Sequence, residues 1–314
     1  MKSMENRASK IMVKRIVLLC LTVLFLSGCG ESGYAPDRGL TLEDGFYPLK
    51  DEVKNYLLLG IDTEGSLSEE REPGAAGQSD AIYLLTCDIP ENRAWIMAIP
   101  RDTMTEIKVF LPSGKDNGSS VDHLTLQYAF GDGRHESCKL TREAVSQLLY
   151  GLPIDGYLAV NLGAIPTCTD LIGGVDVVVP DDSASAEEPS FTKGARVTLD
   201  SRNVKKFLRY RDIDVPQSAM NRMERHKVFF RACARKLREE IKKDSTLALK
   251  LYEACSSEVV TDISVGSLQI IAGMDLEESI ICIPGVEKEG DGYDEFNVEE
   301  SALQEMLCRL FCEP

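Results

Sequence analysis

Apolar runs separated by turn residues predict the strands of a buried sheet. Val53–Gly60 ends in a run of apolar residues closed by a glycine, which is typical of a strand covered on both faces. Ala81–Cys87 and Arg93–Ile99 are two more such runs, and Pro90-Glu91-Asn92 between them predicts a turn that joins them as an antiparallel pair. Further strands are expected at Tyr157–Leu162, Val175–Val179 and Ser279–Ile283.

Apolar residues at helical spacing predict the helices that cover this sheet. The longest is Ala219–Lys243, and Thr141–Leu149 begins with a threonine suited to cap a helix. Shorter helices are expected at Ser201–Leu208, Leu247–Cys255, Ser264–Ala272 and Ser301–Phe311. Loops are expected at Glu64–Gln78, Leu111–Ser120 and Asp181–Ser190, and an extended exit at Arg209–Asp214. The alternation predicts an α/β fold with a central mixed β-sheet flanked by helices.

The first residues have the order of an export signal. Lys10, Lys14 and Arg15 precede the apolar run Ile16–Leu26, which is too short to span a bilayer because a span needs about 20 apolar residues. The run ends in Leu26-Ser27-Gly28-Cys29, which resembles the lipobox of bacterial lipoproteins, where the cysteine is acylated. The sequence therefore predicts a lipoprotein signal peptide at 1–28, a tether at 29–52 and a catalytic domain at 53–314. It places the protein on the extracytoplasmic face of the cell membrane, anchored through lipid on Cys29.

The net charge argues against one class of partner, and the cysteines indicate the state of the thiols. The net charge is −16, and without residues 1–28 it becomes −20, because 30 basic and 50 acidic residues remain. Nucleic acid is therefore not an expected partner, since a polyanion needs a basic surface. The ten cysteines lie mostly in apolar runs, without a CxxC pair, so we expect mostly free, buried thiols. An exported chain with an even number of cysteines is also open to disulfides.

Two aspartates follow or open predicted strands. Asp62 comes after Leu59-Gly60-Ile61, and Asp80 opens the strand that follows the loop. Paired carboxylates beside a phosphate hold Mg²⁺, a hard cation that takes a few oxygens plus phosphate and water. Aspartates at strand ends also cap loops, and spacing alone leaves both interpretations open.

Arginines recur near the ends of the predicted elements. Arg101 follows a strand, Arg209 and Arg211 are two apart, and Arg222, Arg225 and His226 have helical spacing on the long helix. Guanidinium groups bind phosphate oxygens bidentately, so a converging set would bind a diphosphate. Surface ion pairs with nearby acids explain the same residues equally well.

The order of short motifs resembles the LytR-CpsA-Psr family. The motifs run in sequence from about Val53 to Lys243, and Ile281–Gly285 is similar to the usual tail of the family. They are Asn55-Tyr56-Leu57-Leu58-Leu59-Gly60-Ile61-Asp62, Ser79-Asp80-Ala81-Ile82, Ile99-Pro100-Arg101-Asp102-Thr103, Leu152-Pro153-Ile154-Asp155-Gly156-Tyr157, Asp170-Leu171-Ile172-Gly173-Gly174-Val175-Asp176, Lys193-Gly194, Phe207-Leu208-Arg209-Tyr210-Arg211-Asp212 and Asn221-Arg222-Met223-Glu224-Arg225.

The resemblance implies an envelope phosphotransferase. Members move a glycopolymer such as teichoic acid or capsule from an undecaprenyl diphosphate carrier to peptidoglycan. It implies that Asp62 and Asp80 bind Mg²⁺ and that Arg101, Arg209 and Arg211 bind the diphosphate, with Arg222 in the same pocket. Arg225 and His226 are expected to contribute to substrate binding from the same helix. The implied fold is an α-β-α sandwich with an apolar lipid-binding channel.

Three positions depart from the family pattern. Gln78 stands where an arginine often precedes Ser-Asp, Ala219 where an aspartate usually lies, and His226 where a glutamine follows Arg225. Two alternatives to transfer therefore remain. One is a protein that binds a polyprenyl diphosphate without catalysis. The other is a lipid pyrophosphatase that uses water as the acceptor.

We predict that Cys29 is the mature N-terminus and carries lipid, because the basic, apolar and small-residue segments stand in the order that lipoprotein processing requires. Mass spectrometry of the membrane-extracted protein should find a diacylglyceryl group on this residue. An N-terminus that still runs through Cys29 would exclude this anchor.

Overall fold

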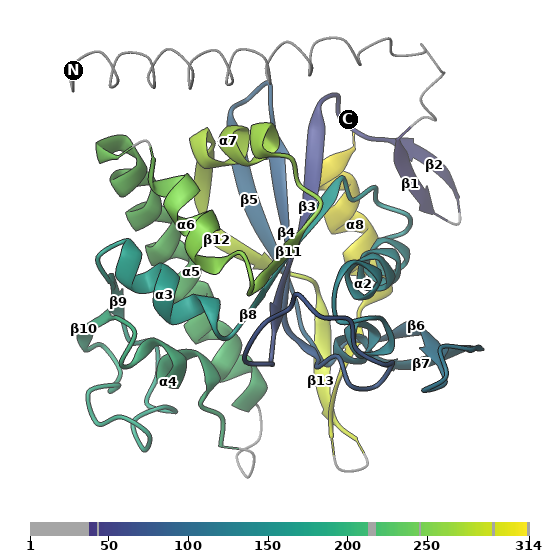
Figure 1. Cartoon of the computed structure of the whole chain (residues 1–314). Helices are drawn as coiled ribbons and strands as arrows, with labels where there is room; N and C mark the ends of the chain where they lie inside the picture. The colour runs from purple at the N-terminus through teal and green to yellow at the C-terminus, as the bar shows by residue number, and fades with distance from the viewer. Residues whose placement is uncertain (1–37, 43, 213–217, 245, 291–292, 313–314) are drawn as a thin grey trace, which may run out of the picture. The chain divides into compact units, whose positions relative to one another are not determined.

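A six-stranded mixed sheet forms the centre of the fold, in the order β11-β8-β3-β4-β5-β12 (Figure 1). Neighbouring strands are antiparallel except for two parallel pairs, β3 with β8 and β5 with β12. The central mixed sheet expected from the sequence is therefore confirmed. The strands are β3 (Val53–Ile61), β4 (Ser79–Asp88), β5 (Arg93–Ile99), β8 (Gly156–Asn161), β11 (Val259–Thr261) and β12 (Asp275–Cys282).

The structure is a computed structural model, and it describes residues 38–42, 44–212, 218–244, 246–290 and 293–312. The predicted signal peptide, the lipidation site Cys29 and the first part of the predicted tether lie outside the described residues. Within those ranges, none of the helices combines the length and apolarity needed to cross a membrane.

Helices cover both faces of the sheet (Figure 1). On one side lie the 3-10 helix η1 (Leu124–Phe130), α2 (His135–Leu148) and α8 (Glu300–Phe311). On the other lie α5 (Ser218–Lys243) and α7 (Val265–Gly273). Alternate side chains of each strand enter the two cores, so Leu57 and Leu84 pack on the first side and Tyr56 and Leu85 on the second. This two-sided burial explains the apolar runs in the sequence.

A third core is built beside the sheet from the segment that carries Arg209, Arg211, Arg222 and Arg225. It contains α3 (Ala164–Leu171), α4 (Val204–Arg209), α6 (Leu247–Cys255), one side of α5, and the two-stranded pair β9 (Val175–Val178) and β10 (Arg196–Leu199). Phe191 and Phe207 meet edge to face at its centre, with ring centroids 5.2 Å apart. The packing of this core sets the position of α4 and of the middle turns of α5.

Three hairpins complete the described chain. They are β1 (Gly39–Leu42) with β2 (Gly45–Pro48), β6 (Met104–Phe110) with β7 (Asp116–His123), and β13 (Gly285–Glu289) with β14 (Asp294–Val298). The expectation of a loop at Leu111–Ser120 is wrong for residues 116–120, which belong to β7. Those positions are polar and exposed, so no apolar alternation marks the strand.

Two helix boundaries also differ from the sequence-based expectation. α2 begins at His135, and Thr141 is interior, with its hydroxyl donating to the carbonyl of Ser137 (2.8 Å). Asp132 accepts from the backbone N–H groups at the start of this helix instead. Arg209 is the last residue of α4 rather than part of an extended exit, so it does not share one side of a strand with Arg211.

Candidate functional site

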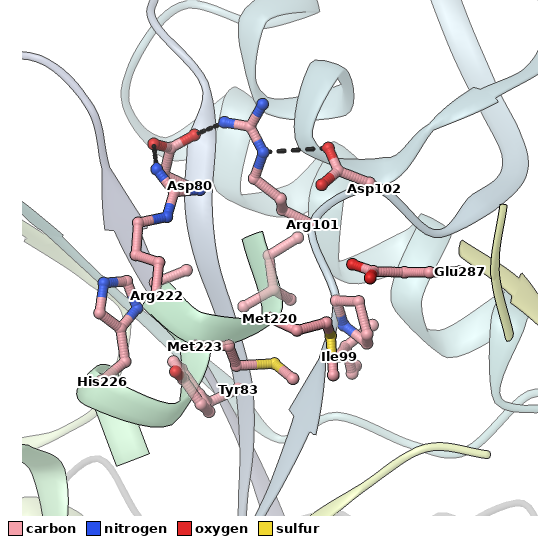
Figure 2. A pocket seen from close by; sticks show the side chains of 13 residues that line it. Asp80, Tyr83, Ile99, Arg101, Asp102, Met220, Arg222, Met223, His226 and Glu287 are labelled. Atoms are coloured by element: carbon pink, nitrogen blue, oxygen red, sulfur yellow. Dashed lines mark hydrogen bonds and ion pairs between the residues drawn. The ribbon is translucent and has the colours of Figure 1, made fainter. Parts of the chain in front are cut away.

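The hairpin of β4 and β5 sets Asp80 opposite Arg101. Ile82 pairs with Ile99 in the antiparallel register. Two residues further along, at the end of the two strands, the same register brings Asp80 to Arg101. The guanidinium donates from Nη1 to Asp80 Oδ1 and from Nε to Asp102 Oδ1, the latter at 3.0 Å (Figure 2). One arginine is thus held between two carboxylates at the end of the central sheet.

Arg222 reaches the same carboxylate from the opposite layer. It lies in the first turns of α5, and its Nη1 donates to Asp80 Oδ2 at 3.0 Å (Figure 2). Asp80 therefore accepts one arginine on each oxygen. We call Asp80, Arg101 and Arg222 the arginine–aspartate cluster. Arg101 and Arg222, from segments far apart in the chain, thus meet at one carboxylate.

The charges of the cluster are only partly balanced. Burial lowers the pKa of Arg101, but Asp80 and Asp102 together raise it by more, so it ends above its ordinary value. For Arg222, which is 10% exposed, burial lowers the pKa, and the attraction of Asp80 does not offset burial and the repulsion of Arg101 and Arg211. An anion that contacted Arg222 would relieve this repulsion.

Arg211 lies beside the cluster and is held by another segment. Its Nη2 contacts Asp294 Oδ2 at 2.7 Å, and its Nε donates to Ser218 Oγ at 2.9 Å. It lines a neighbouring cavity of about 250 Å³ together with Tyr210 and Asn221. Arg211 is therefore close enough for its charge to lower the pKa of Arg222, although it does not line the cavity of the cluster.

Arg209 and Arg225 are not brought to Asp80. Arg209 is 56% exposed and contacts Glu64 at 3.6 Å, which places it beside the loop that begins with Asp62. Arg225 is 1% exposed and donates to the backbone carbonyls of Phe207 (2.8 Å) and Tyr210. The substrate-binding role expected for Arg225 is not supported by this position, because its donors are used to hold the end of α4.

Asp62 caps the loop that follows β3. Its Oδ1 accepts the backbone N–H of Gln78 at 2.7 Å. The preceding residue, Gly77, has φ +82°, and a Cβ there would lie 2.8 Å from the same oxygen and 2.3 Å from Thr63. Only glycine fits this close approach. Asp62 directly follows β3, and Asp80 lies in the adjacent strand β4, so both are at the same end of the sheet.

The carboxylates have a limited capacity to hold Mg²⁺. Among the described residues, no group of three or more His, Cys, Asp or Glu side chains is arranged to hold a metal ion. Both oxygens of Asp80 already contact arginines, and Asp62 uses one oxygen for the loop. These two residues do not make an all-protein metal site, so a Mg²⁺ ion bound here would need phosphate oxygens and water as further ligands.

His226 lines the cavity of the cluster as a neutral ring. Its Nε2 donates to the carbonyl of Leu208 at 2.9 Å, because a carbonyl can only accept. Burial lowers the pKa of His226 to about 4, and the charge of Arg222 adds to the effect. His226 therefore adds no positive charge to the cluster near neutral pH.

Sequence reasoning missed the acidic hairpin β13–β14. Glu287 lines the cavity of the cluster, and Asp294 holds Arg211. The hairpin is attached to the site by the backbone N–H of Phe296, which donates to the carbonyl of Asp102 at 2.8 Å. Burial raises the pKa of Glu287, and the nearby Asp294 and Asp102 raise it further. No local motif marks these acids, since contacts between distant segments bring them to the site, among them the parallel pairing of β12 with β5 and the bridge between Thr103 and Phe296.

The cavity at the cluster is small. Its volume is about 30 Å³, which admits water but not a polyprenyl chain. Its apolar wall contains Tyr83, Ile99, Met220 and Met223 (Figure 2). The open lipid-binding channel expected from the sequence is not present at this cavity.

Comparison with known proteins identifies related chains. The model of the LytR_cpsA_psr family matches residues 38–311. One relative, the polyisoprenyl-teichoic acid–peptidoglycan teichoic acid transferase TagU of Bacillus cereus, is 28% identical over 244 residues, which cover 72% of this chain and 72% of the relative. The TagU of Bacillus subtilis is 26% identical over 240 residues, covering 71% of this chain and 69% of the relative.

Solved structures share the fold. A structure described as TagT bound to LI-WTA superposes with a TM-score of 0.61 at 21% identity, covering 90% of this chain and 98% of the other. At this identity the likeness establishes the α/β fold alone.

We predict that His226 makes folding stability depend on pH. Its folded pKa of about 4 lies below the ordinary value of about 6.5, so the unfolded chain takes up the proton first as the pH falls. The stabilisation is complete above pH 6.5 and is lost as the pH falls towards 4. Urea unfolding at pH 7.5 and pH 5 should differ by about 2 kcal/mol more for the wild type than for His226→Gln. Equal losses in both proteins would exclude this role.

Proposed function

The chain belongs to the LytR-CpsA-Psr family, and from that membership we propose that it transfers a glycopolymer from a polyprenyl diphosphate carrier to peptidoglycan on the extracytoplasmic face of the bacterial membrane. The named relatives are teichoic acid transferases that use a polyisoprenyl-linked donor and a peptidoglycan acceptor. The observation that carries the proposal is the sharing of Asp80 by Arg101 and Arg222.

The cluster suits a diphosphate because of its donors. Each guanidinium presents several N–H groups in a fixed plane, and only some are used by Asp80 and Asp102. A phosphate oxygen is a similar acceptor to the carboxylate oxygen already bound. The diphosphate would therefore share Arg101 and Arg222 with Asp80, with Arg211 beside them and Arg209 beside the loop that begins with Asp62.

The reaction exchanges one phosphorus–oxygen bond for another. A hydroxyl of the acceptor sugar attacks the phosphorus that carries the glycopolymer, and the bond to the bridging oxygen breaks. Polyprenyl phosphate leaves, and its new negative charge is stabilised by the arginines. We assign the proton of the hydroxyl to one of the two carboxylates, Asp62 or Asp80.

Magnesium would assist at the same place. Asp62 and Asp80 would hold the ion together with phosphate oxygens, and a bound Mg²⁺ supplies positive charge against the developing negative charge. The arginines would then contact other oxygens of the same diphosphate, and the aspartates would face it only through the ion.

The lipid would enter along the apolar wall of the cavity. Met220 and Met223 form part of this wall, and methionine side chains adopt many shapes at little cost. A cavity of about 30 Å³ must widen to take a polyprenyl chain. We propose that the first turns of α5 move away from β4 and β5 when the lipid binds.

One assay separates transfer from its two alternatives. The full chain is incubated with Mg²⁺ and a polyprenyl-diphosphate-linked glycopolymer, with and without peptidoglycan. We expect polymer joined to peptidoglycan only when the acceptor is present, and loss of this product with a chelator. Equal cleavage without the acceptor would identify a pyrophosphatase, and binding without cleavage would identify a carrier protein.

We predict that Arg101→Lys weakens binding of undecaprenyl diphosphate although the charge is kept. Lysine lacks the planar fork, so the loss should be about 1.5–3 kcal/mol, or about 10- to 150-fold in the dissociation constant. Arg222→Lys should act in the same direction. The matched control is Arg196→Lys, an exposed arginine on β10. Wild-type affinity in both cluster variants would show that the cluster is not the diphosphate site.

A further inference from the structure

Two cysteine sulfurs lie close together at the edge of the third core. Cys168 is on α3 and Cys255 is the last residue of α6, and their Sγ atoms are 3.1 Å apart. Both thiols are free in the structure. Cys255 is fully buried, whereas Cys168 is partly exposed and open to a reagent in solution.

The pair has no assigned role at the site described above. Neither sulfur lines the cavity of the arginine–aspartate cluster. Cys233 also lies near enough to raise the pKa of the Cys168 thiol. However, the part of the chain that the structure describes holds no group of three potential metal ligands. A bond between the two sulfurs is the chemistry that this contact favours.

The position of the pair in the chain gives such a bond a structural effect. The segment between the two cysteines contains β9, β10, α4 and α5, and it therefore carries Arg211 and Arg222. A bridge would join the two ends of this segment. It would remove many conformations of the unfolded chain, because the closed loop is long.

We propose that Cys168 and Cys255 form a disulfide bond that closes the arginine-bearing segment in the exported protein. The oxidant is a disulfide compound or a disulfide-bearing oxidoreductase. One cysteine thiolate attacks a sulfur of the oxidant and releases one thiol. The second cysteine then attacks the mixed disulfide and releases the other thiol. Two electrons pass to the oxidant and both cysteine protons are released or taken up by the departing thiolates.

The bridge should form during folding rather than after it. Burial raises the pKa of the Cys168 thiol, and the neighbouring Cys255 raises it further. The attacking species is the thiolate, so this thiol reacts slowly once the helices have packed. The unfolded chain lacks this barrier. The proposal depends on export, since disulfides persist in oxidising compartments, but it does not depend on the transfer reaction.

Peptide mapping tests the bridge directly. The full chain is refolded in a buffer of reduced and oxidised glutathione, alkylated, and cut with trypsin without reduction. Cys168 falls in the peptide 143–193 and Cys255 in the peptide 251–288. We expect these two peptides to be joined, with a mass lower by two hydrogen atoms than their sum, and to separate when a reductant is added.

Cys282 is the matched control, because it lies in the same tryptic peptide as Cys255. Cys282→Ser should keep the joined peptides, and Cys255→Ser should lose them. The oxidised wild type should melt about 5–10 °C above the reduced protein, and this difference should vanish in Cys168→Ser. Alkylated Cys168 and Cys255 in the refolded wild type, or a link from Cys168 to Cys233 or Cys282 instead, would overturn the proposal.

Discussion

The architecture of the site depends on one carboxylate that serves two arginines from different layers. Asp80 belongs to the central sheet, Arg101 follows the next strand, and Arg222 comes from the helix packed over them. Removing a buried partner leaves a charge without compensation, which is costly. Asp80 thus holds the start of α5 over the ends of β4 and β5. It also means that any anion must compete with an internal carboxylate, which favours a multivalent ligand over a simple salt ion.

Much of this arrangement follows from the sequence. The apolar runs predict β3, β4 and β5, and the turn at Pro90-Glu91-Asn92 predicts the hairpin whose register puts Asp80 opposite Arg101. The acidic hairpin β13–β14 could not be found in this way. Most of its residues are polar and most are partly buried, and the strand pairings that bring it to the site join segments far apart in the chain.

Helical spacing was an incomplete guide to the arginines. Arg222 and Arg225 are one turn apart on α5, and the sequence predicts them as neighbours. The structure separates their roles because α5 lies between two cores. One side meets the sheet, where Arg222 finds Asp80, and the other meets α4, where Arg225 binds backbone carbonyls. Which face of a long helix meets which partner is decided by tertiary packing, and spacing alone contains no such information.

The ends of the central strands have a consequence for how the protein meets a membrane. Arg38, the first described residue, contacts the carbonyl of Val53, and Lys50 contacts the carbonyl of Leu310, so both ends of the described chain lie near the start of β3. The cluster lies past the other end of this nine-residue strand, about 30 Å away. A domain standing upright on an N-terminal anchor would hold its arginines a full bilayer core's thickness above the lipid headgroups. If the substrate is the membrane-held lipid proposed above and the anchor is the one expected at Cys29, the segment before Arg38 would have to let the cluster reach the lipid headgroups.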